Sequence, residues 1–141
     1  MRRFVLLAWI VLCVGCHDRS ATYQFFYGTN PEPVRAISIG TVEAVEAINA
    51  NDRLPSSVIQ PNRLAVVRTI KVVLGHLPED RFNLAFESVR KNAPVANLTY
   101  VFFWDDNMRC IEMLPVKGEN FVKDGREVPL ETLLHGNARP E

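Results

Sequence analysis

The sequence predicts an all-β fold, a small barrel or sandwich of five to seven short strands with a short C-terminal helix. Two observations support this expectation. Short runs of apolar and β-branched residues, most clearly 64–74 and 98–104, recur along the chain. Turn-forming residues separate these runs, and the Asp124-Gly125 pair is a strong signal for a tight hairpin. A barrel is favoured because closing a sheet removes its exposed edges.

The elements of the first half begin with an aromatic segment. Tyr23, Phe25 and Tyr27 alternate with other residues, which predicts a short strand or a flap. Gly28 to Pro33 ends this segment, because two prolines and a glycine continue neither regular structure. We predict a strand over 35–48, although the Ala and Glu residues of 41–50 leave a helix open as the alternative. A loop over 49–62 follows.

The second half reads as strands joined by turns. Residues 98–104 are almost continuously apolar, which predicts the most buried strand. Asp105-Asp106-Asn107 predicts a hairpin turn, since these side chains accept local backbone hydrogen bonds. Pro129 suits a first helical position and Gly136 a C-cap, so a short helix is expected over 130–135. The other strands are expected at 64–74, 82–86, 108–114, 121–123 and 126–128.

Length and charge limit the classes of function. The chain has 141 residues and is 48% hydrophobic, which is enough for one buried core and argues against disorder. It has 16 basic and 16 acidic side chains. Without Arg2 and Arg3, 14 basic residues remain, a net charge of about −2. Nucleic acid is therefore not an expected partner, because it requires a basic face.

The N-terminus has the parts of a secretory signal peptide. Arg2 and Arg3 precede the apolar run 4–14, and Gly15 and Cys16 follow it. A positive start, a short apolar stretch and a small residue before the cut define such a signal. The run is too short to cross a bilayer, which needs roughly 20 residues. We therefore predict export rather than a permanent transmembrane helix.

The segment Leu12-Cys13-Val14-Gly15-Cys16 resembles the lipobox of bacterial lipoproteins, with Cys13 where Leu is usual. The resemblance implies signal cleavage between Gly15 and Cys16, with the lipid attached to Cys16. Cleavage by an ordinary signal peptidase, which would leave Cys16 as a free thiol, is the alternative. His17 rather than Asp follows Cys16. The resemblance therefore implies a lipid anchor in the cell envelope, in the outer membrane facing the periplasm if the organism has two membranes.

This interpretation divides the chain into four parts. They are a signal peptide over 1–15, a lipid tether and aromatic segment over 16–33, a β-barrel domain over 34–136 and a tail over 137–141. Cys13 leaves with the signal and Cys16 carries lipid, so Cys110 has no partner within the chain. A lone exposed thiol is a liability in an oxidising compartment, so Cys110 is expected to be buried.

Several short segments follow one another in a characteristic order: Ile39-Gly40-Thr41-Val42, Val72-Val73-Leu74-Gly75, Thr99-Tyr100-Val101-Phe102-Phe103, Gly118-Glu119-Asn120-Phe121 and Asp124-Gly125. This order resembles that of the OB-like barrels of the netrin and metalloproteinase-inhibitor type, over roughly Val34 to Val128. Such modules often have paired cysteines, which are absent here. The resemblance implies a binding module and transfers no catalytic residue.

No catalytic residue, cofactor or metal site is predicted. The chain has no Gly-x-Ser-x-Gly motif, and its histidines, His17, His76 and His135, show no ligand spacing. The turn Asp105-Asp106-Asn107 has oxygens suited to calcium, but it lacks the spacing of a calcium loop and a distal Glu. A hydrolase with dispersed carboxylates such as Asp52, Glu87 and Asp105 is the enzymatic alternative, because spacing cannot reveal such a site.

The expected function is therefore non-enzymatic. The sequence favours a small envelope lipoprotein that binds a protein or a cell-wall component, and a purely structural envelope role is a further alternative. Tyr23, Phe25 and Tyr27 are the candidate ligand-facing residues, because they lie outside the best-patterned strands. The aromatic residues of 100–104 are expected to lie in the core.

Overall fold

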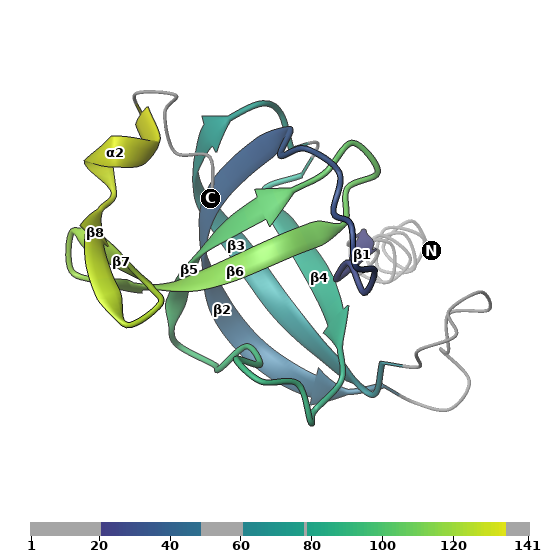
Figure 1. Ribbon diagram of the computed structural model, residues 1–141. Coiled ribbons are helices and arrows are strands. Elements are labelled where there is room, and N and C mark those ends of the chain that lie inside the picture. Colours follow the sequence, from purple (N-terminus) through teal and green to yellow (C-terminus); the bar gives the residue numbers. More distant parts are fainter. Residues whose placement is uncertain (1–20, 49–60, 78, 135–141) are drawn as a thin grey trace, which may run out of the picture.

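The computed structural model describes residues 21–48, 61–77 and 79–134. These residues form a single sheet of eight strands, followed by one short helix (Figure 1). The strand order is β1-β4-β3-β2-β5-β6-β7-β8, and only the β1–β4 pair is parallel. The mostly-β class and the short C-terminal helix are confirmed, but the described residues form eight strands instead of the five to seven expected, because residues 22–24 add a short edge strand to the sheet. The elements are β1 (Thr22–Gln24), β2 (Ala36–Ala47), β3 (Arg63–Leu74), β4 (Arg81–Phe86), β5 (Thr99–Trp104), β6 (Cys110–Lys117), β7 (Asn120–Lys123), β8 (Arg126–Pro129) and α2 (Glu131–Leu134).

The sheet is strongly curled but open, so the prediction of a closed barrel or a two-sheet sandwich is wrong. β1 has only three residues and pairs with β4. Its extension meets β6 through a single bridge between Phe25 and Cys110, where the Phe26 amide donates to the Cys110 carbonyl at 2.9 Å. The far end of β6 pairs instead with β7, and β8 forms the last edge. β1 therefore forms a ladder with β4 alone, and its side of the sheet stays open toward β6.

Residues 41–47, for which a helix was the alternative, belong to strand β2. This strand pairs with β3 from Ile37 to Ala47 and with β5 over Ala36 to Thr41. Gly40 lies where the neighbouring chain comes close, because an added Cβ would be 2.9 Å from Val67 Cγ1 and 3.0 Å from the Arg68 carbonyl oxygen. A register shift between Val42 and Ala44 then changes the alternation of β2.

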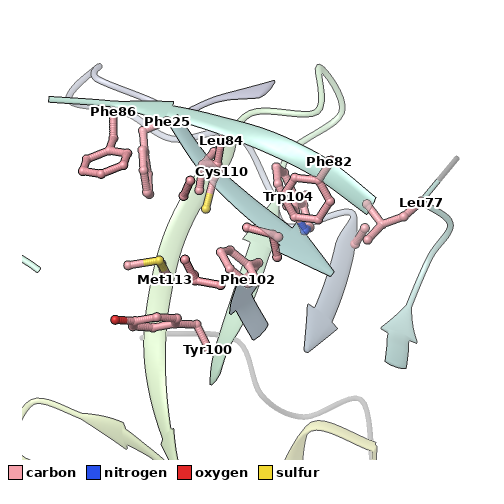
Figure 2. Close-up of a cluster of buried hydrophobic side chains, with 14 residues drawn as sticks. Phe25, Leu77, Phe82, Leu84, Phe86, Tyr100, Phe102, Trp104, Cys110 and Met113 are labelled. Carbon is pink, nitrogen blue, oxygen red and sulfur yellow. The ribbon is translucent and has the colours of Figure 1, made fainter. Parts of the chain in front are cut away.

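The main core fills the inside of the curl (Figure 2). Aromatic rings from β4 and β5 pack edge to face, with the Phe82 and Trp104 centroids 5.2 Å apart. The buried indole Nε1 of Trp104 donates to Ser38 Oγ at 3.0 Å, so its one polar group is satisfied. The labelled members of this cluster are Phe25, Leu77, Phe82, Leu84, Phe86, Tyr100, Phe102, Trp104, Cys110 and Met113.

A second apolar cluster covers the other face of the sheet near β5. Ile37, Val101, Phe103, Phe121 and Leu133 are buried there, beneath the β7–β8 hairpin and α2. Residues 100 to 104 are therefore buried on both faces, which confirms the expected most buried strand. Figure 1 shows this hairpin and helix (yellow) on the opposite side of the sheet from β1 (purple).

The predicted turns are confirmed. Asp124 and Gly125 have φ values of 50° and 75°, the positive pair that a tight hairpin between β7 and β8 requires. The helix α2 lies inside the predicted range 130–135, of which His135 is outside the described residues. Most of the predicted loop 49–62 is also outside them. None of the helices within the described part has the length and apolarity that crossing a membrane requires.

Candidate functional site

The aromatic segment 23–27 packs into the domain at its first residues. The Tyr23 ring contacts Phe82 and Trp104 edge to face, with both centroid distances 5.6 Å. Phe25 is 2% exposed and belongs to the main core. Burial and the nearby Glu79 carboxylate raise the pKa of the Tyr23 hydroxyl. Of the three candidate ligand-facing residues, Tyr27 therefore has the side chain most accessible to a partner, at 37% exposed.

Arg90 holds the end of this segment from the loop between β4 and β5. Its guanidinium carbon lies 3.9 Å from the Phe25 ring centroid and 5.8 Å from the Tyr27 centroid. Such stacking of a cation on an aromatic face is worth about 0.5–1 kcal/mol at exposed sites and more when water is excluded. Burial raises the pKa of Tyr27, an effect that the positive charge of Arg90 opposes.

An exposed apolar side chain adjoins Arg90 in the chain, because Val89 is 87% exposed. We call Tyr27, Arg90 and the adjoining Val89 the Tyr27–Arg90 patch, which combines an aromatic ring, a guanidinium and an exposed aliphatic side chain. Aromatic and Arg side chains are enriched where proteins bind one another. No local pattern in the sequence points to Arg90, because only folding brings this loop residue to the aromatic segment.

A second arginine, from the turn between β5 and β6, also contacts this segment. The Arg109 guanidinium lies 4.9 Å from the Phe26 ring centroid. Its Nε also donates to Asp105 Oδ2 at 2.9 Å, so Arg109 joins the aromatic segment to the β5–β6 turn. The segment is therefore fixed between two loops.

The turn Asp105-Asp106-Asn107 uses its buried carboxylate for its own backbone. Asp105 Oδ1 accepts the amides of Asn107 and Arg109, each at 2.9 Å, and Oδ2 accepts Arg109 Nε. Its side chain is fully buried. Asp106 faces solvent and pairs with Arg35 at 2.9 Å. Among the described residues no group of three or more His, Cys, Asp or Glu side chains is placed to hold a metal ion.

Cys110 is buried, as predicted. Its thiol is completely enclosed and donates to the Glu112 carbonyl at 3.4 Å. Burial raises the pKa of this thiol strongly, so the reactive thiolate is disfavoured. The residue acts as a small apolar side chain of the core, and a covalent role is disfavoured at neutral pH.

Several candidate residues lie outside the described ranges: Gly15, Cys16, His17, Asp52 and His135. The dispersed-carboxylate hypothesis therefore rests on Glu87 and Asp105 alone within the structure. Glu87 is partly exposed at the end of β4, whereas Asp105 is committed to its turn. His76 is exposed in the turn after β3.

The comparisons with known proteins give no relative. The chain matches no protein-family model, and no curated protein or solved structure matches it significantly.

Proposed function

We propose that the protein is a non-enzymatic envelope lipoprotein, a small β domain tethered by lipid at Cys16, that binds a protein or a cell-wall partner. The observation that carries the proposal is the signal-like segment ending in Gly15-Cys16 directly before a folded domain. The first described residue, Ala21, is only five positions beyond Cys16 and is already hydrogen-bonded into the sheet, since its carbonyl accepts the Asn83 amide at 2.9 Å.

The Tyr27–Arg90 patch is the surface that we assign to the partner. It lies at the end of the aromatic segment that leads from the tether, and Arg90 is already oriented by its stacking on Phe25. An ordered side chain loses less conformational freedom on binding than a free one. A partner that covers the exposed Val89 side chain would remove apolar surface from water, which favours binding. This combination suits a partner with an apolar spot flanked by acidic or hydroxyl groups.

The resemblance to netrin-type OB-like domains stays a hypothesis within this proposal. The curled sheet and the order β3-β2-β5 are compatible with it, whereas the open edge between β1 and β6 is a departure from a closed barrel. The resemblance adds a binding role and no chemistry.

The anchor is tested by intact mass spectrometry of protein from detergent-solubilised membranes, beside a Cys16→Ala variant. We expect a wild-type mass with the signal removed and acyl chains added, and no acylation of the variant. A soluble, unacylated wild-type protein would overturn the anchor and leave Cys16 as a free thiol.

The binding surface is tested by cross-linking in intact envelopes with Val89→Asp beside Leu134→Asp. Both changes place an acid at an exposed apolar position, with Leu134 53% exposed on α2. We expect Val89→Asp alone to abolish a specific cross-linked species. Equal loss in both variants, or a species that survives in both, contradicts the assignment of the patch. Absence of any cross-linked species in the wild type would favour the structural alternative.

A further inference from the structure

Two arginines lie side by side on the outer face of the sheet. Arg68 of β3 is directly opposite Arg81 of β4. Both hold the same carboxylate, because Arg68 Nε is 2.8 Å from Glu43 Oε1 and Arg81 Nη2 is 3.0 Å from Glu43 Oε2. Glu43 lies at the register shift of β2, which aims its side chain at the pair. We call these three residues the arginine pair with Glu43.

The arrangement has an excess of positive charge. Two guanidinium groups share one carboxylate, which leaves a net charge of +1, and directly opposed like charges destabilise a sheet. Within the described residues Glu43 is the one acidic side chain that forms an ion pair with either arginine. The Arg68 and Arg81 side chains are 69% and 59% exposed. Their remaining N–H donors are therefore available for a second anion, whose charge would complete the group.

The arginine pair lies next to the point where the tether enters the domain. β1 is hydrogen-bonded to β4, and its Thr22 is in register with Asn83, two positions beyond Arg81. Adjacent strands are about 4.8 Å apart and successive residues about 3.3 Å, so the backbone positions of Arg81 and Arg68 lie roughly 8 Å and 12 Å from that of Thr22. Cys16 precedes Ala21 by five residues. An extended chain spans at most about 3.5 Å per residue, which puts Ala21 within roughly 18 Å of Cys16.

Nearby acidic groups weaken the attraction between this face and an anionic surface, because they offset part of its positive charge. Glu79 Oε2 accepts the Ala21 amide at 3.0 Å, and Asp80 precedes Arg81. The face would therefore bind an anionic surface weakly from free solution. A short tether changes this, because it makes the contact intramolecular and raises the local concentration of headgroups around the face. The geometry suits an orienting contact better than an independent binding site.

We propose that Arg68 and Arg81 bind the phosphates of anionic lipid headgroups in the membrane that carries the anchor. This inference rests on the proposed function, since it requires Cys16 to be attached to lipid. The contact turns the β2–β3–β4 face toward the bilayer. It also fixes the tether side of the domain at the membrane surface.

The test measures the reactivity of individual arginines. The mature lipidated protein is placed in vesicles of phosphatidylcholine, or of phosphatidylcholine and phosphatidylglycerol in roughly a 2:1 ratio, and labelled with phenylglyoxal. Peptide mass spectrometry then gives the labelling rates of Arg68, Arg81 and the control Arg126 on β8. We expect about fivefold slower labelling of the first two in anionic vesicles, which corresponds to about 1 kcal/mol per basic residue near an anionic surface.

Charge-tuning variants sharpen the result. Glu43→Gln removes the shared carboxylate and should increase the protection of both arginines. Arg68→Gln should reduce the protection of Arg81. Salt at about 0.5 M should remove the protection in every form, because it screens surface charges. Equal labelling in the two kinds of vesicle, or equal protection of Arg126, would overturn the proposal. Protection by millimolar inorganic phosphate without vesicles would assign the pair to a free phosphate ligand and would also overturn it.

A chemically anchored form separates this proposal from the proposed function. The unlipidated chain from Cys16 onward is coupled through the Cys16 thiol to a maleimide lipid, and the buried Cys110 is expected not to react. If the native protein carries no lipid, the anchor proposal fails on its own measurement. If the chemically anchored form then shows no protection in anionic vesicles, the headgroup contact fails independently.

Discussion

Asp105 is expected to stabilise the domain through the β5–β6 turn, and replacing it separates a structural role from metal binding. Its carboxylate is fully buried and accepts three hydrogen bonds of 2.9 Å. Asp105→Ala removes all three and leaves the amides of Asn107 and Arg109 without their acceptor, so it should lower the free energy of unfolding by about 2–4 kcal/mol. Asp105→Asn keeps an oxygen for the two amides and loses one charge-assisted bond, for about 1.5–3 kcal/mol. The lower part of that range applies, because the Arg109 side chain is 37% exposed.

Urea unfolding followed by circular dichroism measures these losses. For Asp105→Asn the midpoint should fall by roughly 1 M at a slope of about 2 kcal/mol/M. Asp106→Asn is the matched control, because the Asp106–Arg35 pair is exposed, and it should change stability by less than about 1 kcal/mol. Calcium should leave the wild-type midpoint unchanged. A full-stability Asp105→Asn, or a midpoint that rises with calcium, would refute the assignment of this carboxylate to the turn.

Three further predictions concern the sheet and its core. Thr69 Oγ1 is buried with no hydrogen-bond partner among the described residues, so Thr69→Val should raise the free energy of unfolding by about 1 kcal/mol in a thermal melt. Thr41→Val is the control and should lower that free energy by about 1 kcal/mol, because Thr41 Oγ1 and Thr99 Oγ1 share a hydrogen bond of 2.8 Å. Gly40→Ala should destabilise the protein by about 1–3 kcal/mol in denaturant titration, because the added methyl meets backbone of β3; unchanged stability would contradict the close approach. Burial raises the pKa of Cys110, so above about pH 9 only the unfolded thiol ionises. The free energy of unfolding of the wild type should therefore fall by up to about 1.4 kcal/mol per pH unit relative to Cys110→Ala. Parallel curves of unfolding free energy against pH for the two proteins would contradict this.

The strands and turns were predictable because their signals are local. Phe82, Leu84 and Phe86 alternate with less apolar neighbours, and all three are buried in β4. Asp124 and Gly125 adopt the positive φ angles that their residue types tolerate. Residues 41–47 were ambiguous because Ala and Glu favour a helix locally. Pairing with β3 stabilises the strand there, as tertiary contacts commonly override propensity.

The partners of each strand were not predictable in the same way. Nothing in Thr22–Gln24 indicates a parallel pairing with β4, because parallel neighbours can be far apart in sequence. The shift at Val42 and Ala44 adds one residue to β2 without a glycine to signal it, yet it sets the direction of Glu43. The Tyr27–Arg90 patch and the arginine pair both depend on such long-range placement. This explains why spacing along the chain revealed neither surface.

The geometry of β1 links the proposed anchor to the stability of the domain. The Glu79 carboxylate holds the start of the segment at Ala21, while Arg90 and Arg109 hold its end through the rings of Phe25 and Phe26. Phe25 itself is part of the main core. A lipid at Cys16 would therefore be attached, through the four residues 17–20, to a strand fixed at both ends. Because a chain spans at most about 3.5 Å per residue, Ala21 would stay within roughly 18 Å of the anchor, so the surfaces that lie near the membrane would be determined by how β1 is built into the sheet.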